Sequence, residues 1–194
     1  DDLTIDVNHS SILIDKINLK LKTILPDNFL LFQFRYTFFE KLNWNLNEFN
    51  YLMSQILSKY DYILFSSDVE NNKKSKFYNN YFRRNYSIID TLNYQRIVNS
   101  KNSNIFFLDN INSENLFYVI KESNINLAKE GIYSHISYFH KKKCHNLFNF
   151  NINSKSDFIH QKISYSEWCK NMNFSFSFLN SDIIKSSRKI LKNI

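Results

Sequence analysis

Glycine, proline and alanine each occur only once in this chain of 194 residues, at Gly131, Pro26 and Ala128. The chain relies instead on Asn, Lys, Ile, Phe and Tyr, whose codons are rich in A and T. This bias indicates an AT-rich genome, and we expect a bacterial source. Because coding bias explains much of the Asn and Lys content, an isolated Asn or Lys is no evidence of a turn or a ligand site.

Cysteine is also scarce, and Cys144 and Cys169 form neither a metal-binding pattern nor a disulfide framework. Such usage is typical of a reduced, cytosolic protein. No apolar run approaches the length of a transmembrane helix, and no secretory signal peptide is recognisable. The sequence begins at Asp1 without an initiating Met, so we expect it to be part of a longer protein.

Apolar and aromatic side chains are plentiful. Hydrophobic residues make up 43% of the sequence and aromatic residues 17%, enough for a folded core, which argues against bulk disorder. The formal net charge of +7 favours anionic partners such as phosphates, nucleic acid or a membrane surface. Lysine-rich coding with solvated faces would produce the same charge, so charge alone leaves the partner open.

Short apolar runs alternate with amphipathic segments. Strands are predicted at residues 28–34, 61–67, 104–109, 124–129 and 144–150. Helices are predicted at residues 10–25, 45–60, 88–101, 112–123, 131–140, 164–170 and 181–193. Residues 69–85 are polar and irregular, and residues 173–179 alternate between polar and aromatic.

Strands that alternate with helices indicate a parallel sheet covered on both faces. With right-handed crossovers, the expected fold is α/β, a doubly wound, mostly parallel sheet of Rossmann type. We expect residues 1–27 to form a connecting helix or arm and residues 28–160 the Rossmann-like domain. Residues 161–194 would form a C-terminal tail with the final helix.

Gly131 lies at the predicted turn from a strand into a helix, at the carboxyl edge of the sheet where such folds bind ligands. Glycine permits an unusual backbone dihedral there, or lets a ligand approach the amides closely. The N-terminus of the helix would suit a phosphate or diphosphate. A tight strand–helix turn would explain the same glycine.

Three side chains near Gly131 could complete such a site. His135 could hydrogen-bond a phosphate or a sugar hydroxyl, Ser134 a phosphate oxygen, and Glu130 the hydroxyls of a ribose. Each also has a structural explanation, because His135 could simply pack, Ser134 could cap the helix and Glu130 could favour its N-terminus. Cys144 and His145 fit the next core strand and are expected to be structural.

The segment around Gly131 reads KEGIYSHISYFHKKKCHNLFN, residues 129–149. It resembles the nucleotide-sugar-binding half of heptosyltransferase-like glycosyltransferases, glycosyltransferase family 9. That family has a strand, then Asp-Thr/Ser-Gly-Pro-x-His, an apolar helix, and an apolar strand ending in Leu-Phe-Gly. The spacing matches without a gap from His135 to Phe148. Lys129 and Glu130 stand where the family has Asp and Thr, and one extra residue separates the glycine from the histidine.

The loop after the first strand fits the same family more loosely. The family carries a Lys and a Trp before the next helix, and this chain has Lys41 and Trp44, while residues 35–38 replace the family's glycines. By the resemblance, Lys41 would contact the donor diphosphate. Lys41 or Arg35 near the carboxyl end of a strand could neutralise phosphate oxygens. Lys41 could equally face solvent, and Trp44 could equally pack the start of the helix.

The resemblance covers about residues 28–150 and implies the donor-binding half of a GT-B glycosyltransferase. Such an enzyme would transfer a sugar from a nucleotide-diphosphate sugar to a glycan or lipopolysaccharide-type acceptor, with inversion. The acceptor domain and the catalytic base would belong to an N-terminal half. No cofactor or metal is expected, and the sequence has no Asp-x-Asp motif. The expected donor contacts are Arg35, Lys41, Glu130, Gly131, Ser134 and His135.

The resemblance further implies a cytoplasmic protein of cell-envelope synthesis, compatible with peripheral association at the inner membrane and without a nucleic-acid partner. Two alternatives remain open. Basic and aromatic residues interleave between residues 73 and 86, which would suit single-stranded nucleic acid. The departures from the family's glycines would also suit a degenerate, non-catalytic interaction domain.

Overall fold

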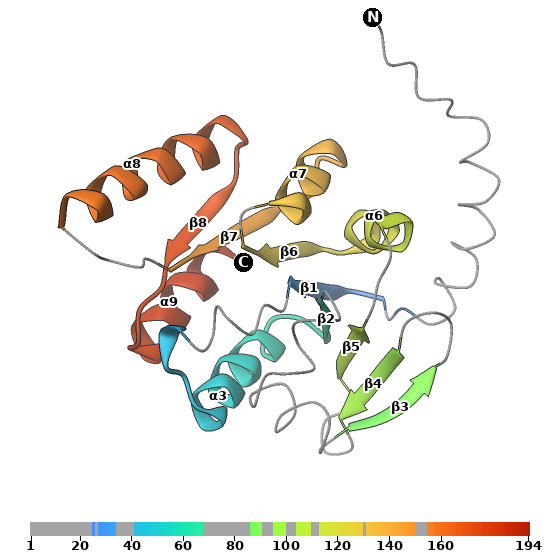
Figure 1. Ribbon diagram of the computed structural model, residues 1–194. Coiled ribbons are helices and arrows are strands. Elements are labelled where there is room, and N and C mark those ends of the chain that lie inside the picture. The colour runs from blue at the N-terminus through green and yellow to red at the C-terminus, as the bar shows by residue number, and fades with distance from the viewer. Residues whose placement is uncertain are drawn as a thin grey trace, which may run out of the picture.

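The computed structural model describes residues 25, 27–33, 41–67, 86–90, 95–99, 104–109, 113–129, 131–149 and 155–194, and the statements below concern these residues. Within them, eight strands form one sheet (Figure 1). The strands are β1 (Phe29–Gln33), β2 (Tyr62–Ser67), β3 (Tyr86–Asp90), β4 (Gln95–Asn99), β5 (Ile105–Asp109), β6 (Ile125–Ala128), β7 (Cys144–Phe148) and β8 (Ser175–Phe178). The helices are α3 (Leu46–Leu57), α6 (Ser113–Glu122), α7 (Ile132–Phe139), α8 (Lys155–Asn171) and α9 (Ile183–Asn193).

The spatial order of the strands is β3-β4-β5-β2-β1-β6-β7-β8. The six strands from β5 to β8 in this order are all parallel. Counted along the chain, their order is 3-2-1-4-5-6, which is the Rossmann arrangement. The predicted α/β fold with a doubly wound, mostly parallel sheet is therefore confirmed.

Alternate residues of the central strand β1 face two separate core clusters. Leu30 and Phe32 pack with α3 and α9, whereas Phe29 and Leu31 pack with α6, α7 and α8. Figure 1 shows these two groups of helices on opposite sides of the sheet. Because both faces of β1 are covered, its sequence is a continuous apolar run and not an alternating one.

The helix predicted at residues 88–101 is wrong. Residues 86–90 and 95–99 form β3 and β4, which pair antiparallel, and β4 continues antiparallel onto β5. The segment is rich in β-branched Ile and Val, which favour extended backbone, and its short apolar pairs fit either period. Pairing with the open edge of β5 favoured the strands over the helix. That edge exists only in the tertiary structure, so the sequence could not show it.

The C-terminal residues belong to the same sheet-and-helix arrangement. α8 extends beyond the predicted helix at 164–170 and runs across the expected boundary at residue 160. The alternating run at 173–179 contains β8, which pairs with β7, and the predicted helix at 181–193 is confirmed as α9. Residues 10–24 of the predicted helix at 10–25 and the irregular segment at 69–85 lie outside the described residues.

We predict that Phe65→Ala lowers the free energy of unfolding by about 3–5 kcal/mol. Phe65 is fully buried, and its ring centroid lies 5.2 Å from that of Phe32 and 5.8 Å from that of Phe49. Urea denaturation followed by circular dichroism measures the change. Phe139, whose side chain is 73% exposed, supplies the matched control, and Phe139→Ala should change stability by about 0.5 kcal/mol or less. Similar losses for both variants would refute this account of the core.

Candidate functional site

The sheet has a topological switch point between β1 and β6, since the chain leaves these neighbouring strands toward opposite sides. In open α/β sheets, ligands bind in the crevice outside the carboxyl ends of such strands. The two strand ends are joined here, because the Lys129 amide donates a hydrogen bond to Gln33 Oε1 at 3.0 Å. Gln33 is only 5% exposed, so this polar side chain is committed to holding the two strands in register.

Gly131 begins α7 directly beside this switch point. Its backbone angles are φ 132° and ψ −151°, a region that is essentially restricted to glycine. A Cβ built at this position would meet nothing within 4 Å. The glycine is therefore required by the backbone conformation and not by crowding, and the space beside it is open among the described atoms.

Two buried side chains in the first turn of α7 anchor the helix to the sheet. The hydroxyls of Tyr133 and Ser66 lie 2.7 Å apart, which links α7 to the carboxyl end of β2. The Ser134 hydroxyl donates to Asn146 Oδ1 at 2.6 Å, which links α7 to β7. All four side chains are at most 2% exposed. The N-terminus of α7 is thereby fixed above the strand ends.

Sequence reasoning missed Gln33, Ser66, Tyr133 and Asn146. The available signal was a polar residue within or at the end of an otherwise apolar strand, as in FLLFQ, YILFSS and CHNLF. Burying such a group is costly unless it finds a hydrogen-bond partner, so its presence indicates a specific contact. The partner itself could not be read from the sequence.

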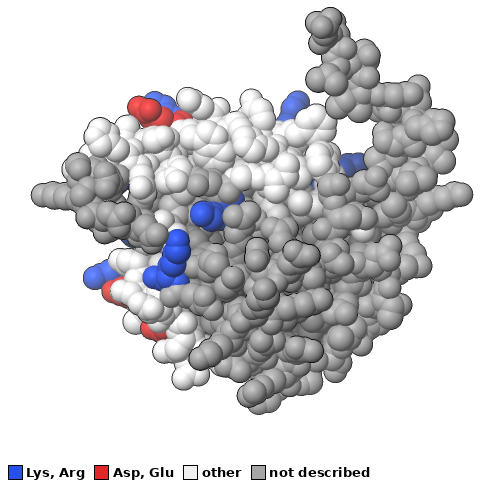
Figure 2. All heavy atoms as spheres, in the orientation of Figure 1, with Lys and Arg blue, Asp and Glu red and all other residues white. Residues whose placement is uncertain are grey.

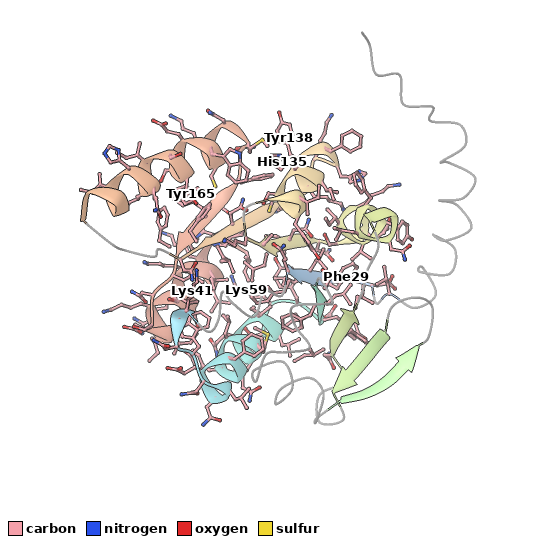
Figure 3. All side chains as sticks on the ribbon, viewed as in Figure 1. Phe29, Lys41, Lys59, His135, Tyr138 and Tyr165 are labelled. Atoms are coloured by element: carbon pink, nitrogen blue, oxygen red, sulfur yellow. The ribbon has the colours of Figure 1, made fainter. Side chains whose placement is uncertain are left out.

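Ser134 and His135 occupy different environments although they are adjacent. Ser134 is fully buried and its hydroxyl is already used inside the fold, so a direct ligand contact would require it to leave the interior. His135 is exposed, and its ring lies edge-on to Trp168 of α8 at a centroid distance of 5.9 Å. Its imidazole is therefore accessible, on the side of α7 that faces α8 (Figure 3).

Lys41 is exposed but lies away from the Gly131 turn. The following residues Leu42 and Trp44 are buried, and the Trp44 indole N–H donates to the Asn180 carbonyl at 3.1 Å. This contact ties the start of α3 to the loop between β8 and α9. Figure 3 shows Lys41 beside α9 and well apart from His135 on α7. Trp44 thus packs the start of the helix, which is one of the two roles considered for it from the sequence.

Arg35 and Glu130 lie outside the described residues. Of the six predicted donor contacts, the structure places Gly131, Ser134 and His135 together and Lys41 apart from them. Within the described ranges, no group of three or more His, Cys, Asp and Glu side chains could hold a metal ion. On the face shown in Figure 2, the Lys and Arg atoms of the described residues form separate groups among white residues.

The titratable core groups on β7 are held neutral. Burial raises the pKa of the Cys144 thiol to about 12, more than its hydrogen bonds to Ser137 and Ser134 lower it. His145 is fully buried, and its two ring nitrogens lie 2.7 and 2.9 Å from the hydroxyls of Ser175 and Ser177. Burial lowers the pKa of His145 to about 4. Both residues are structural, as expected from the sequence.

These features define the class of fold, a Rossmann-like α/β unit. No protein-family model matches the sequence, and no curated protein matches it. Among solved structures, the chain is similar to UDP-GlcNAc 2-epimerase from Methanocaldococcus jannaschii in complex with UDP-GlcNAc and UDP. The identity is 16% and the TM-score 0.53, over 93% of this chain and 42% of that chain.

A second similar structure is the NMR solution structure of ALG13, with 8% identity and a TM-score of 0.54 over 86% of each chain. At these identities, the likeness shows the fold. The chain spans 42% of the length of the epimerase that it matches. The narrower resemblance to glycosyltransferase family 9 stays a prediction.

We predict that Gly131→Ala and Gly131→Ser each lower the free energy of unfolding by about 1–3 kcal/mol. The two losses should be equal, because the added side chain meets open space and only the backbone conformation is strained. Asn173, which also has a positive φ of 56°, provides the control. Asn173→Gly relieves strain and should not destabilise the protein. A loss that grows with side-chain size at position 131 would contradict this explanation.

We predict an acid-induced loss of stability that depends on His145. Its pKa is lower in the folded chain than in the unfolded chain, so the unfolded chain binds more protons between about pH 6.5 and pH 4. Stability is complete above this window and falls through it, by about 2 kcal/mol between pH 7 and pH 5 from this one group. Urea denaturation at the two pH values measures the change.

His145→Gln should remove that part of the pH dependence while keeping a polar side chain between Ser175 and Ser177. The control is His160→Gln, since His160 is exposed on α8. If His145→Gln leaves the pH dependence unchanged, His145 is not its source.

Proposed function

We propose that this chain is the donor-binding part of a glycosyltransferase that uses a nucleotide-diphosphate sugar. The observation that carries the proposal is the Gly131 turn, which starts a helix at the switch point of a Rossmann-like sheet and leaves open space beside it. Helix N-termini bind phosphate groups through backbone amides and the helix dipole. The fold likeness to a structure that contains UDP-GlcNAc and UDP supports the same ligand class.

In this proposal the diphosphate lies against the N-terminus of α7. His135 donates a hydrogen bond to a phosphate or sugar hydroxyl from the exposed side of the helix. Ser134 acts indirectly, by holding α7 to Asn146 on β7. Glu130 binds the ribose, and Arg35 contributes positive charge from the segment that follows β1. Lys41, which lies beside α9 and apart from His135, adds positive charge only at long range.

The proposed reaction is sugar transfer with inversion and without a metal ion. Negative charge grows on the leaving diphosphate as the sugar–oxygen bond breaks, and oriented amides and cations stabilise that charge in the transition state. A glycan or glycolipid hydroxyl is the proposed acceptor. The catalytic base is assigned to another part of the enzyme, because the chain spans 42% of the similar epimerase.

Isothermal titration of the chain with UDP and UDP-GlcNAc tests the proposal, followed by the other nucleoside diphosphates. We predict saturable binding that EDTA does not abolish. His135→Ala should weaken it by about tenfold or more, since a hydrogen bond to a charged group contributes about 1.5–3 kcal/mol. Lys41→Ala should weaken it less, because this side chain is solvent-exposed and lies apart from His135.

His160→Ala and Lys170→Ala are matched controls on the exposed surface of α8 and should bind as the unaltered chain does. Absence of binding to every nucleoside diphosphate, or an equal loss in the controls, would overturn the proposal. Salt-dependent retention of single-stranded oligonucleotides would instead support a nucleic-acid module. If neither ligand class binds, a non-catalytic interaction domain becomes the better account.

A further inference from the structure

A second surface, away from the Gly131 turn, combines exposed aromatic and basic side chains. It lies where α6 and α7 end side by side, at the edge of the sheet opposite the carboxyl ends of the parallel strands (Figure 1). We refer to it as the α6–α7 patch. It consists of Phe117, Lys121, Phe139, His140, Lys141 and Lys142.

The aromatic part of the patch is contiguous. Phe139 is 73% exposed, the highest value among the exposed large hydrophobic side chains of the described residues, and Phe117 is 40% exposed. Both rings contact the His140 ring edge-on, at centroid distances of 5.1 Å and 5.9 Å. Leaving this much apolar area in water is unfavourable, so a binding partner would gain from covering it.

The basic part surrounds the same histidine. Burial, followed by the positive charges of Lys121 and Lys142, lowers the pKa of His140, so both ammonium groups act on this spot. Of the lysines in the patch, Lys121 and Lys141 are exposed and Lys142 is half-buried. Within the described ranges, the one ion pair joins Lys185 to Asp182 on α9, so no carboxylate there pairs with these lysines. Glu122, which follows Lys121 in α6, acts instead on Tyr118: burial and then the negative charge of Glu122 raise the pKa of the Tyr118 hydroxyl.

The backbone holds these lysines in place. Lys141 adopts the left-handed conformation, with φ 54°. The Lys141 and Lys142 amides donate to the carbonyls of Tyr138 and Ser137 at 3.0 and 2.8 Å. This is the Schellman arrangement, in which glycine usually occupies the left-handed position. The backbone of Lys141 and Lys142 is therefore fixed directly after Phe139, and the two lysines are not carried on a separate loop.

We propose that the α6–α7 patch docks this chain peripherally onto an anionic lipid bilayer. Aromatic rings settle at the boundary between headgroups and acyl chains, and neighbouring lysines reach the acidic headgroups on flexible apolar stems. The charge of the patch is complementary to such a surface. None of the described helices has the length and apolar character to cross a bilayer.

This docking would leave the Gly131 turn accessible. α7 runs from Gly131 at the carboxyl edge of the sheet to Phe139 at the opposite edge, and its eight residues span about 12 Å. The open space beside Gly131 would thus face away from the lipid, toward soluble ligands. The proposal does not depend on which ligand binds there.

Vesicle flotation tests the proposal with the unaltered chain and vesicles of phosphatidylcholine, alone or mixed with phosphatidylglycerol. We expect binding to the mixed vesicles and none to the neutral ones. The triple variant K121Q/K141Q/K142Q should bind about a hundredfold more weakly, since each lysine near an anionic surface contributes about a fivefold factor. The double variant F117S/F139S should lose about tenfold or more through its apolar contacts.

Two control variants make the same kinds of substitution outside the α6–α7 patch. K162Q/K170Q/K192Q removes three exposed cations from α8 and α9, and I163S removes an exposed apolar side chain from α8. Both should bind as the unaltered chain does. The variant Phe139→Trp gives a positive signal for binding, because the fluorescence of the introduced indole should shift to the blue only with anionic vesicles.

Four results would overturn the proposal: no binding to anionic vesicles, equal losses in the control variants, no blue shift, or binding that the lysine changes weaken and the phenylalanine changes do not. A dimer in solution that F117S/F139S converts to a monomer would assign the patch to a second copy of this chain.

Discussion

The pairing of β1 with β6 is the constraint on which the rest of the structure depends. The two strands are far apart in sequence, yet they lie side by side in parallel register, and Asn124 donates to the Phe29 carbonyl at the start of the pair. Everything before β6 builds the sheet outward on one side, and everything after it builds on the other. In open α/β sheets, a crevice forms at the carboxyl ends of two such strands, because the connections that follow them leave toward opposite faces.

Buried polar side chains convert that crevice into a defined site. Gln33 accepts the Lys129 amide, Tyr133 meets Ser66, and Ser134 donates to Asn146. Each of these groups would be costly to bury alone, and each makes a hydrogen bond with a partner from another element. Together, these hydrogen bonds position the N-terminus of α7 above the strand ends. The side chains that hold the site are thus different from those that would meet a ligand, such as the exposed His135.

The parallel core could be predicted from the sequence because both faces of its strands are buried. Runs such as FLLFQ and YILFSS have no alternation, and the helices between them have a clear apolar face, as in α3 with Phe49, Leu52, Met53 and Ile56. The antiparallel β3 and β4 could not be predicted in the same way, because their short apolar pairs fit a helix as well as a strand. β8 was similarly hidden, since its Ser–Phe alternation becomes a strand only when β7 offers an edge.

By itself, the sequence determined the Rossmann-like fold class and located a turn at Gly131 with an unusual backbone conformation. Periodicity and a lone glycine are local properties, and they remain readable in a chain with strongly biased composition. Only the tertiary structure decided that Ser134 faces inward and His135 outward, and that Lys41 lies beside α9 instead of beside Gly131. Residues adjacent in sequence differ in burial only after packing has given each side of a helix a different environment. The same packing brought Phe117 and Phe139 together around His140 from two separate helices.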